Sequence, residues 1–448
     1  MTAATRPRRP RRRRARGQRG IALLAVITAV AICLVIVNEF GTRTTIDMMQ
    51  ARNNLDQMRA HFLAQSSLNI SDVVLRLQHQ LDENAKNGPM AEQLKGVQIT
   101  DFADALMAAF GGDAEQVRGA VGPLADTSKG LGADIGTFGV RMTPVDGKIN
   151  VNCAADSNMR DVTGMALLSL LYPTAFDPLF EEPDAEGWRR NRETQVGAII
   201  DYIDSDSYKV EYRPKTDRQP ARWETTSAAE AYGYEDLRDT YKPKNDRIDS
   251  VAELRLVRGV DDRFWTLFGK AFRHYGRCKV NLRALDDVHV VMSLLSGAPA
   301  DENDPIVQNP AWLFAMANLV IQAKQFGVVF MTNDEFMSFV KDPLGELQGV
   351  LGTSAPGTMP TGTPSLPPVP WPSSIKGLEL DRAKLANIAE TTEVQTYEVE
   401  AWSEINRPPF LPIRRTIHAV WDQKFRFSNS RSPLLQNGGG TWLYLREE

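Results

Sequence analysis

The sequence has few histidines and few cysteines, and it lacks the common short motifs of enzymes. Its five histidines, at positions 61, 79, 274, 289 and 418, show no spacing typical of a metal site. The chain contains no G-x-S-x-G nucleophile motif, no H-E-x-x-H zinc motif and no phosphate-binding loop. We therefore expect a protein that is not an enzyme.

Acidic residues outnumber basic ones outside the N-terminus. The chain has 52 basic and 56 acidic residues, and nine of its arginines lie within the first 20 positions. Without those nine, 43 basic residues face 56 acidic ones, so the rest of the chain carries a net charge near −13. Binding of nucleic acid requires a basic face, so this charge balance predicts no nucleic-acid partner.

One long apolar run, residues 21–37 (IALLAVITAVAICLVIV), follows the arginine-rich segment directly. As a helix it would be about 25 Å long, slightly short of the roughly 30 Å hydrocarbon core of a bilayer. Arginines beside a membrane helix stay in the cytoplasm. We therefore expect a single pass through the inner membrane, with the remaining chain in the periplasm.

The boundary between residues 20 and 21 is the expected processing site. A secretory signal would place small residues and a cleavage site after the apolar run, but Asn38-Glu39-Phe40-Gly41 is a poor site. A cut after Gly20 would leave Ile21 as the first mature residue, as in type IV pilins and pseudopilins. A plain single-pass anchor is the alternative.

The rest of the chain changes character several times. Apolar residues at helical spacing predict one helix over about residues 21–83, or two helices broken at Gly41. Asp146-Gly147 predicts a tight hairpin turn between two short strands. Residues 158–345 are mainly helical in pattern, residues 346–378 form a Pro/Gly-rich linker, and strand-like alternation follows.

These segments predict an α+β domain interrupted by a helical one. We expect a basic leader over residues 1–20, a membrane helix over 21–41, and the first part of the α+β domain over 42–157. An all-helical domain over 158–345 and the linker over 346–378 would precede the last strands, over 379–448. The expected helices span 101–110, 162–171, 193–203, 250–258, 261–272, 285–295, 310–326, 333–341 and 381–389, and the expected last strands are VQTYEVEAW, RRTIHAVW, KFRF and TWLYLRE.

The leader and six short pieces, in order, resemble minor pseudopilin K of type II secretion systems, also called general secretion pathway protein K. The pieces are GKINVNCA, IIDYIDSDS, YGYEDLRDTYKPKND, SVAELRLVRGVD, CKVNLRAL and YEVEAWSEIN. The linker, the long leader and Ser205, where proline is common, depart from the family pattern. The resemblance implies a pseudopilin fold, with a long N-terminal helix plus an antiparallel sheet.

The same resemblance implies a non-enzymatic role at the tip of the periplasmic pseudopilus. This subunit would assist initiation of the pseudopilus and export of folded proteins through the outer membrane. Its partners would be minor pseudopilins I and J, with the secretin and the exported protein as indirect partners. A prepilin peptidase would cut after Gly20 and methylate Ile21. A minor pilin of a type IV pilus and a signal-anchored periplasmic enzyme or binding protein remain alternatives.

Ala25 stands where most pilins carry a glutamate as the fifth mature residue. That carboxylate meets the N-terminal amine of a neighbouring subunit, and an unpaired charge in the bilayer is costly. A subunit with no neighbour above it gains nothing from the pair, so Ala25 suits a tip subunit. The alternative is that Ala25 is ordinary membrane-spanning sequence.

Asp201, Asp204 and Asp206 form an acidic cluster at the end of an expected helix, and Glu235 and Asp236 form a second one. Calcium is bound by six to eight oxygen ligands, and the resemblance implies calcium in the inserted domain. These five residues are the candidate ligands, although the spacing is not that of an EF-hand. A solvated acidic loop is the alternative.

Cys153 follows one short expected strand (INVN) and Cys278 precedes another (CKVNL). If those two strands pair antiparallel, the sulfurs could approach bonding distance, and the periplasm permits oxidation. Two separate buried thiols are the alternative. Cys33 lies in the membrane helix and is expected to stay a thiol.

Overall fold

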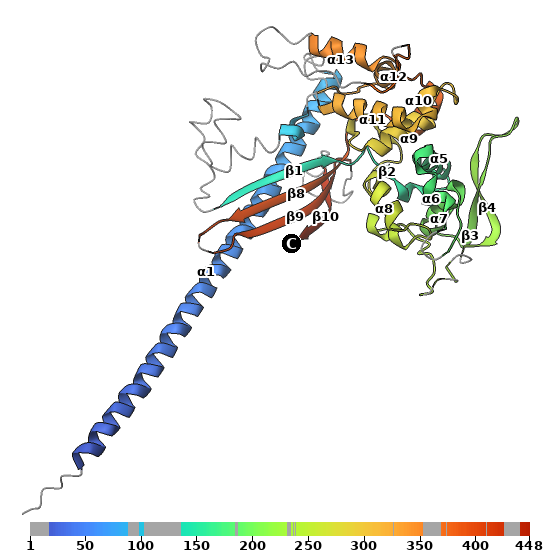
Figure 1. Ribbon diagram of the computed structural model, residues 1–448. Coiled ribbons are helices and arrows are strands. Elements are labelled where there is room, and N and C mark those ends of the chain that lie inside the picture. Colours follow the sequence, from blue (N-terminus) through green and yellow to red (C-terminus); the bar gives the residue numbers. More distant parts are fainter. Residues whose placement is uncertain are drawn as a thin grey trace, which may run out of the picture.

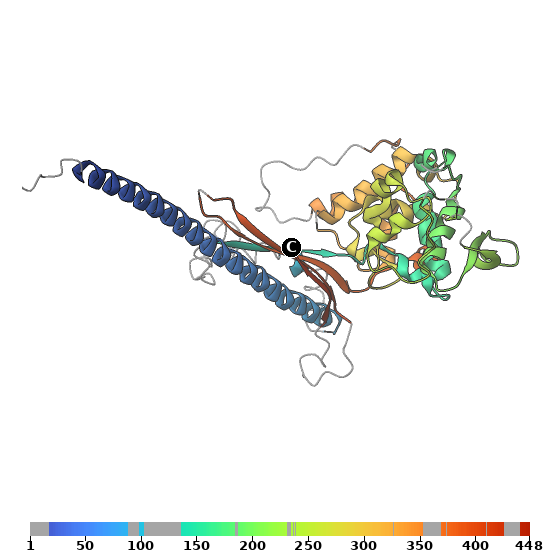
Figure 2. The same ribbon diagram turned by 90° about the horizontal axis from the view of Figure 1, so that it is seen from below.

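The computed structural model describes residues 18–87, 98–102, 136–183, 187–230, 234–235, 237, 239–325, 327–352, 369–372, 374–408, 410–424 and 440–448. They form two parts, a sheet packed on one long helix and a mainly helical body at one end of that sheet (Figures 1 and 2). This is the α+β arrangement that the sequence predicts.

The N-terminal helix α1 (Gln18–Asn87) is 70 residues long, or about 105 Å. It runs unbroken through Gly41, so the single long helix is confirmed and the alternative of two helices is wrong. The side chains of residues 21–55 are exposed. The stretch beginning at Ile21 is the one candidate membrane span among the described residues. Its most apolar part packs against nothing else in the protein.

The sheet has four antiparallel strands in the order β1-β8-β9-β10. Sequence alternation correctly indicated the last three. Lys424 belongs to the expected strand KFRF, whose other residues lie outside the described part. The strands are β1 (Thr137–Pro144), β8 (Thr396–Ile405), β9 (Ile413–Asp422) and β10 (Thr441–Glu447).

Small residues bring the second half of α1 close to the sheet. Ala60, Ala64 and Ser67 are fully buried on the helix face that meets the strands. The Ser67 hydroxyl donates to the carbonyl of Gly139 at 2.6 Å, and the Ser403 hydroxyl donates to that of Ala60 at 2.6 Å. These bonds satisfy buried hydroxyls that would otherwise be costly, and they fix the helix against the strands.

The helical body has its own hydrophobic core, which runs from Ile149 to Ala389. Leu378 and Leu385 belong to this core, so the expected boundaries at 158, 345 and 379 are wrong. Helix α13 (Pro343–Gly352) also occupies the start of the expected linker. The other helices are α5 (Arg160–Leu171), α6 (Pro178–Glu181), α7 (Arg192–Ile203), α8 (Asp262–Phe268), α9 (Val288–Gly297), α10 (Pro305–Gln308), α11 (Pro310–Gln325), α12 (Asn333–Lys341) and α14 (Arg382–Ile388).

The body is not all-helical, because it contains the antiparallel hairpin β3 (Tyr208–Arg213) and β4 (Arg222–Ala229). The expected helix at 250–258 is a short 3₁₀ helix (Val251–Leu256), with the Ser250–Glu253 capping box present. The expected helix at 261–272 ends earlier, at Phe268. Of the expected helix at 101–110, the structure describes only the 3₁₀ turn that ends at Phe102.

The expected hairpin at Asp146-Gly147 is wrong, although a turn is present there. Strand β1 pairs with β8, whereas β2 (Ile149–Asn150) enters the body and pairs parallel with β5 (Phe272–Arg273). A Cβ on Gly147 would lie 2.1 Å from the carbonyl oxygen of Ala284. Close backbone approach, rather than hairpin formation, therefore requires this glycine.

Asp146 holds the junction between the sheet and the body. Its carboxylate forms a buried ion pair with Arg273 and accepts the backbone N–H groups of Gln395 and Thr396, the latter at 3.1 Å. Its carbonyl accepts the N–H of Asn281 at 2.8 Å. One aspartate thus joins the chain leaving the sheet to the chain returning to it.

We expect Asp146→Ala to destabilise the protein by about 3–5 kcal/mol, because it leaves Arg273 buried without its partner. Asp146→Asn, which keeps a hydrogen-bond acceptor, should cost less. Chemical denaturation of the full chain in detergent would measure both losses. Arg382→Ala, at an exposed ion pair, is the control and should change stability by less than about 0.5 kcal/mol. A loss below 1 kcal/mol for Asp146→Ala would contradict the central role of this junction.

Candidate metal centre

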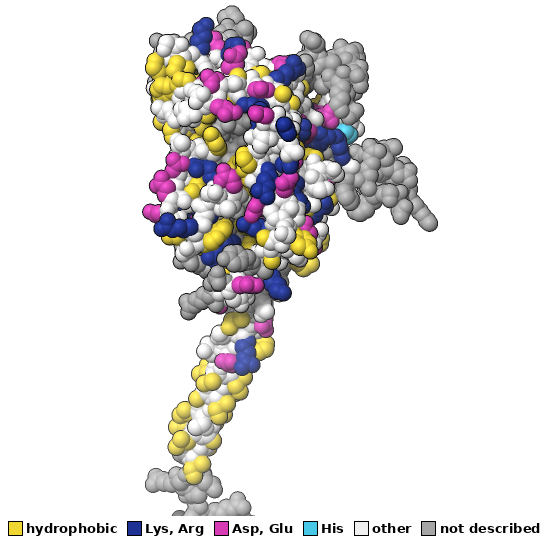
Figure 3. All heavy atoms as spheres, turned by 90° about the vertical axis from the view of Figure 1, so that its right-hand side faces the viewer, with side chains coloured by type: hydrophobic (Ala, Val, Ile, Leu, Met, Phe, Trp, Pro, Cys, Tyr) yellow, Lys and Arg dark blue, Asp and Glu magenta, His cyan; other side chains and the backbone are white. Residues whose placement is uncertain are grey.

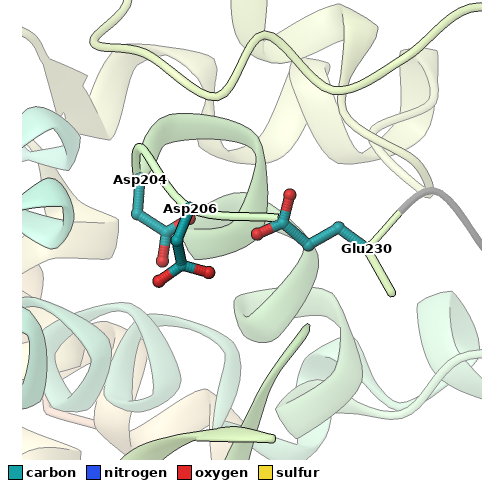
Figure 4. Close-up of side chains that lie close together, drawn as sticks. All are labelled: Asp204, Asp206 and Glu230. Carbon is teal, nitrogen blue, oxygen red and sulfur yellow. The ribbon is translucent and has the colours of Figure 1, made fainter. Parts of the chain in front are cut away.

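Three carboxylates meet at the base of the β3–β4 hairpin. Asp204 and Asp206 lie between the end of α7 and the start of β3, and Glu230 directly follows β4. One oxygen from each lies within 4.8 Å of the others. Figure 4 shows the Glu230 side chain extending toward the two aspartates. The hairpin creates this group by returning β4 beside β3.

The structure distributes the sequence-predicted ligands differently from the prediction. Asp204 and Asp206 come together as expected, but their third partner is Glu230. Asp201, in the last turn of α7, accepts the backbone N–H of Val210 at 2.7 Å. Glu235 is exposed and is not part of the group, and Asp236 lies outside the described residues.

The carboxylates of Glu230 and Asp204 are buried against one another. Glu230 is 7% exposed and Asp204 is 1% exposed, and the Glu230 carboxylate also hydrogen-bonds the side chain of Asn245. One oxygen of Asp204 pairs with Arg160 at 3.0 Å. Buried carboxylates this close together are stabilised by a cation shared between them.

Asn245 borders the same group with an unusual backbone conformation. Its φ of 50° lies in the left-handed region, which asparagine tolerates better than most residues. Its side-chain amide donates to the carbonyl of Asp206 at 2.6 Å, and its Oδ1 is buried without a partner. Sequence reasoning missed both Asn245 and Glu230, because neither belongs to either acidic cluster of the sequence.

Burial raises the pKa of three acidic side chains in this region, Asp201, Asp204 and Glu230. The pKa of Asp204 rises to about 6, and those of Asp201 and Glu230 rise to about 8, with neighbouring carboxylates adding to the effect. A buried carboxylate is stabilised by a proton or by a cation. Asp204, Asp206 and Glu230 are hard oxygen ligands of the kind that calcium prefers, so they fit calcium in a structural role.

A disulfide joins Cys153 to Cys278, with an S–S distance of 2.06 Å and a Cα–Cα distance of 5.5 Å. The strand pairing expected to bring them together is wrong. INVN contributes β2, which pairs with β5, and CKVNL contributes β6 (Val280–Asn281), which pairs parallel with β7 (Ala389–Glu390). Cys33 is a free thiol on the exposed part of α1.

Comparison with known proteins finds similarity to solved structures only. No protein-family model matches the chain, and no curated protein matches it. The chain is similar to one in the crystal structure of the GspK-GspI-GspJ complex from the enterotoxigenic Escherichia coli type 2 secretion system. The two chains are 13% identical with a TM-score of 0.45, and the match covers 89% of this chain and 99% of the other. Similarity at this level does not by itself establish a function.

We expect the cation-free protein to lose stability as the pH rises from about 4 to about 8. The three acids ionise near pH 4 when unfolded, but only near pH 6 and 8 when folded, so the folded state is penalised above pH 4. The raised pKa of Asp204 alone corresponds to a loss of about 3 kcal/mol, at about 1.4 kcal/mol per pKa unit.

Thermal unfolding in chelator, compared between the wild type and Glu230→Gln, would isolate this effect from other titrations. The variant should lose less stability over the same pH range, and calcium should remove most of the loss in the wild type. If the wild type and Glu230→Gln lost the same stability over this pH range in chelator, the shifted pKa values would be contradicted.

Proposed function

We propose that this chain is a K-type minor pseudopilin of a type II secretion system. One observation carries the proposal. A single helix begins as an exposed apolar segment next to the arginine-rich leader, and it continues unbroken until its second half packs on an antiparallel sheet. A helix that is at once membrane anchor and domain core suits a subunit drawn from the bilayer into a filament.

The surface of the protein supports an anchor outside the folded body. Figure 3 shows hydrophobic side chains covering the outer part of α1, whereas acidic and basic side chains are interspersed over the body. Ile21, Leu24 and Val37 are each more than 60% exposed. Apolar exposure on this scale requires a bilayer or neighbouring helices.

The helical body supports a position at the tip. It lies beyond the sheet, at the end of the molecule away from the apolar part of α1 (Figures 1 and 2). A second subunit stacked above would collide with it. Ala25 also lacks the carboxylate that would receive a neighbour's N-terminal amine. We therefore propose one copy per pseudopilus, assisting its initiation and the export of folded proteins.

The free face of α1 offers a surface for minor pseudopilins I and J. Ala60 and Ala64 face the sheet, whereas Leu55, Met58 and Phe62 are 46–59% exposed. Apolar residues at spacings of three and four form one stripe along a helix. Packing against the α1 helices of two smaller subunits would bury this stripe.

Calcium is part of the proposal, as a structural ion of the helical body. Asp204, Asp206 and Glu230 would hold it, with Asn245 beside them. Glu230 and Asp204 are 7% and 1% exposed, and burial of neighbouring carboxylates supports a bound cation over a solvated acidic loop.

The alternatives differ in what they leave unexplained. A minor pilin of a type IV pilus would share the leader and helix, but an inserted body of this size would be unusual. A signal-anchored periplasmic enzyme or binding protein would not need the anchor to continue as the core helix of the domain. The methylated N-terminus tested below separates a pilin-like subunit from an anchored enzyme.

Processing is the first test. In cells that contain a prepilin peptidase, intact-mass spectrometry should find a mature chain that begins at methylated Ile21. A bulky residue, as in Gly20→Leu, should block the cut, whereas Gly20→Ala is the conservative control. Recovery of the wild-type chain with Met1 intact would contradict the proposal.

Partner binding is the second test. Met58→Glu should reduce co-purification with minor pseudopilins I and J at least tenfold, because it places a charge within the proposed helix contact. Leu256→Glu is the matched control, since Leu256 is similarly exposed (48%) but lies on the helical body. Equal binding by both variants would exclude this face of α1 as the contact with minor pseudopilins I and J. If the labelled protein were found along the length of assembled pseudopili, the tip position would be excluded.

A further inference from the structure

The loop between β8 and β9 exposes two large apolar side chains. Leu411 is 89% exposed, more than any other large hydrophobic residue that the structure describes, and Phe410 is 49% exposed. The N–H of Phe410 donates to the carbonyl of Arg407 at 3.0 Å, and Pro408 and Pro412 restrict the backbone on either side. A restricted loop that exposes apolar side chains is suited to contact another surface.

A buried carboxylate fixes this loop to α1. Asp56 of α1 is only 6% exposed, and it pairs with Arg407 of the loop at 3.2 Å. Met49, one turn and a half before Asp56 on the helix, lines a small groove together with Phe410 and Leu411. The loop therefore lies beside α1 between Met49 and Asp56, at the end of the sheet nearer the apolar part of the helix (Figures 1 and 2).

This level of α1 is close to the expected membrane surface. Counted from Ile21, a hydrocarbon core about 30 Å thick ends near Phe40. Met49 lies about 14 Å further along the helix, and lipid headgroups occupy about 5–8 Å of that distance. Membrane helices tilt by about 20° on average and by up to about 40°. A tilt toward the side of the loop lowers the loop, so its tip is within reach of the headgroups.

The surroundings of the loop are basic, unlike the rest of the protein. Residues 43–59 of α1 and residues 404–415 around the loop contain six arginines and three acidic residues. One of these acids, Asp56, is buried and already paired with Arg59 and Arg407. Outside the leader, by contrast, the chain has a net charge near −13. Basic residues beside an exposed apolar tip form the combination that binds an anionic lipid surface.

We propose that the β8–β9 loop docks on the surface of the membrane that holds α1, and that it does so on anionic phospholipid. Phe410 and Leu411 enter the headgroup region, and the exposed arginines Arg52 and Arg414 bind lipid phosphates. Two membrane contacts, the anchor and the loop, then fix the tilt of α1 before the subunit joins a filament. The inference rests on the membrane anchor of the proposed function, and it adds a second contact and the class of lipid.

Fluorescence quenching of the full chain in vesicles tests the contact. The vesicles contain phosphatidylethanolamine and phosphatidylglycerol, and Cys33→Ser removes the free thiol. A nitrobenzoxadiazole label is attached at Leu411→Cys or, as the control, at Leu256→Cys, because Leu256 is 48% exposed but lies on the helical body. Lipids with a nitroxide in the headgroup should quench the label at 411 about threefold more than the label at 256, because only the loop reaches the headgroups. Equal quenching at the two positions would overturn the proposal.

Lipid charge and the apolar tip are tested separately. Replacing phosphatidylglycerol with phosphatidylcholine should lower the quenching at 411 about twofold, because the arginines lose their anionic partners. Phe410→Asp should lower it by about the same factor, because a carboxylate is costly near the bilayer, whereas Leu256→Asp should leave it unchanged. Unchanged quenching in phosphatidylcholine would overturn the anionic surface, and unchanged quenching with Phe410→Asp would overturn the apolar contact.

Flotation of the same vesicles distinguishes the possible failures. If the chain does not float with the vesicles, the membrane anchor fails and the docking of the loop fails with it. If the chain floats but the label at 411 is not quenched, only the docking of the loop is overturned. If that label is shielded only after minor pseudopilins I and J are added, the loop contacts protein, and the proposal of a lipid surface is overturned.

Discussion

The architecture depends on one buried ion pair, between Asp146 and Arg273. The chain leaves the sheet after β1 and returns to it at β8, and both crossings pass this carboxylate. Because Asp146 also accepts the N–H groups at the start of β8, entry and exit are fixed together, and the helical body is seated on the sheet as one piece.

Periodicity along the sequence was sufficient to predict the long helix and the last strands, because each depends on a local pattern that burial on one face imposes. It failed at Asp146-Gly147. A tight turn is a local signal, but the partner of β1 lies about 250 residues further along the chain. The body boundaries failed for a related reason. Leu378 and Leu385 follow a segment rich in proline and glycine, and only their packing shows that they belong to the earlier core.

The candidate site was half visible in the sequence. Asp204 and Asp206 are closely spaced acidic residues at a helix end, and together with the family resemblance this pattern made them candidate ligands. Glu230 and Asn245 were not predictable, because the first arrives through strand pairing and the second through a loop with positive φ. The disulfide shows the opposite case. The two cysteines were identified as a possible pair, but the strand pairing invoked for them does not occur.

The insertion also constrains the order of folding. Contacts between β1 and β8 close a loop that contains the entire helical body, and non-local contacts of this kind form slowly. The body, by contrast, has a core of its own and a disulfide within it. It can therefore fold and oxidise before the sheet is complete. Once it has done so, the ends of β1 and β8 are already neighbours, and the remaining search for the sheet is reduced to the joining of strands held side by side.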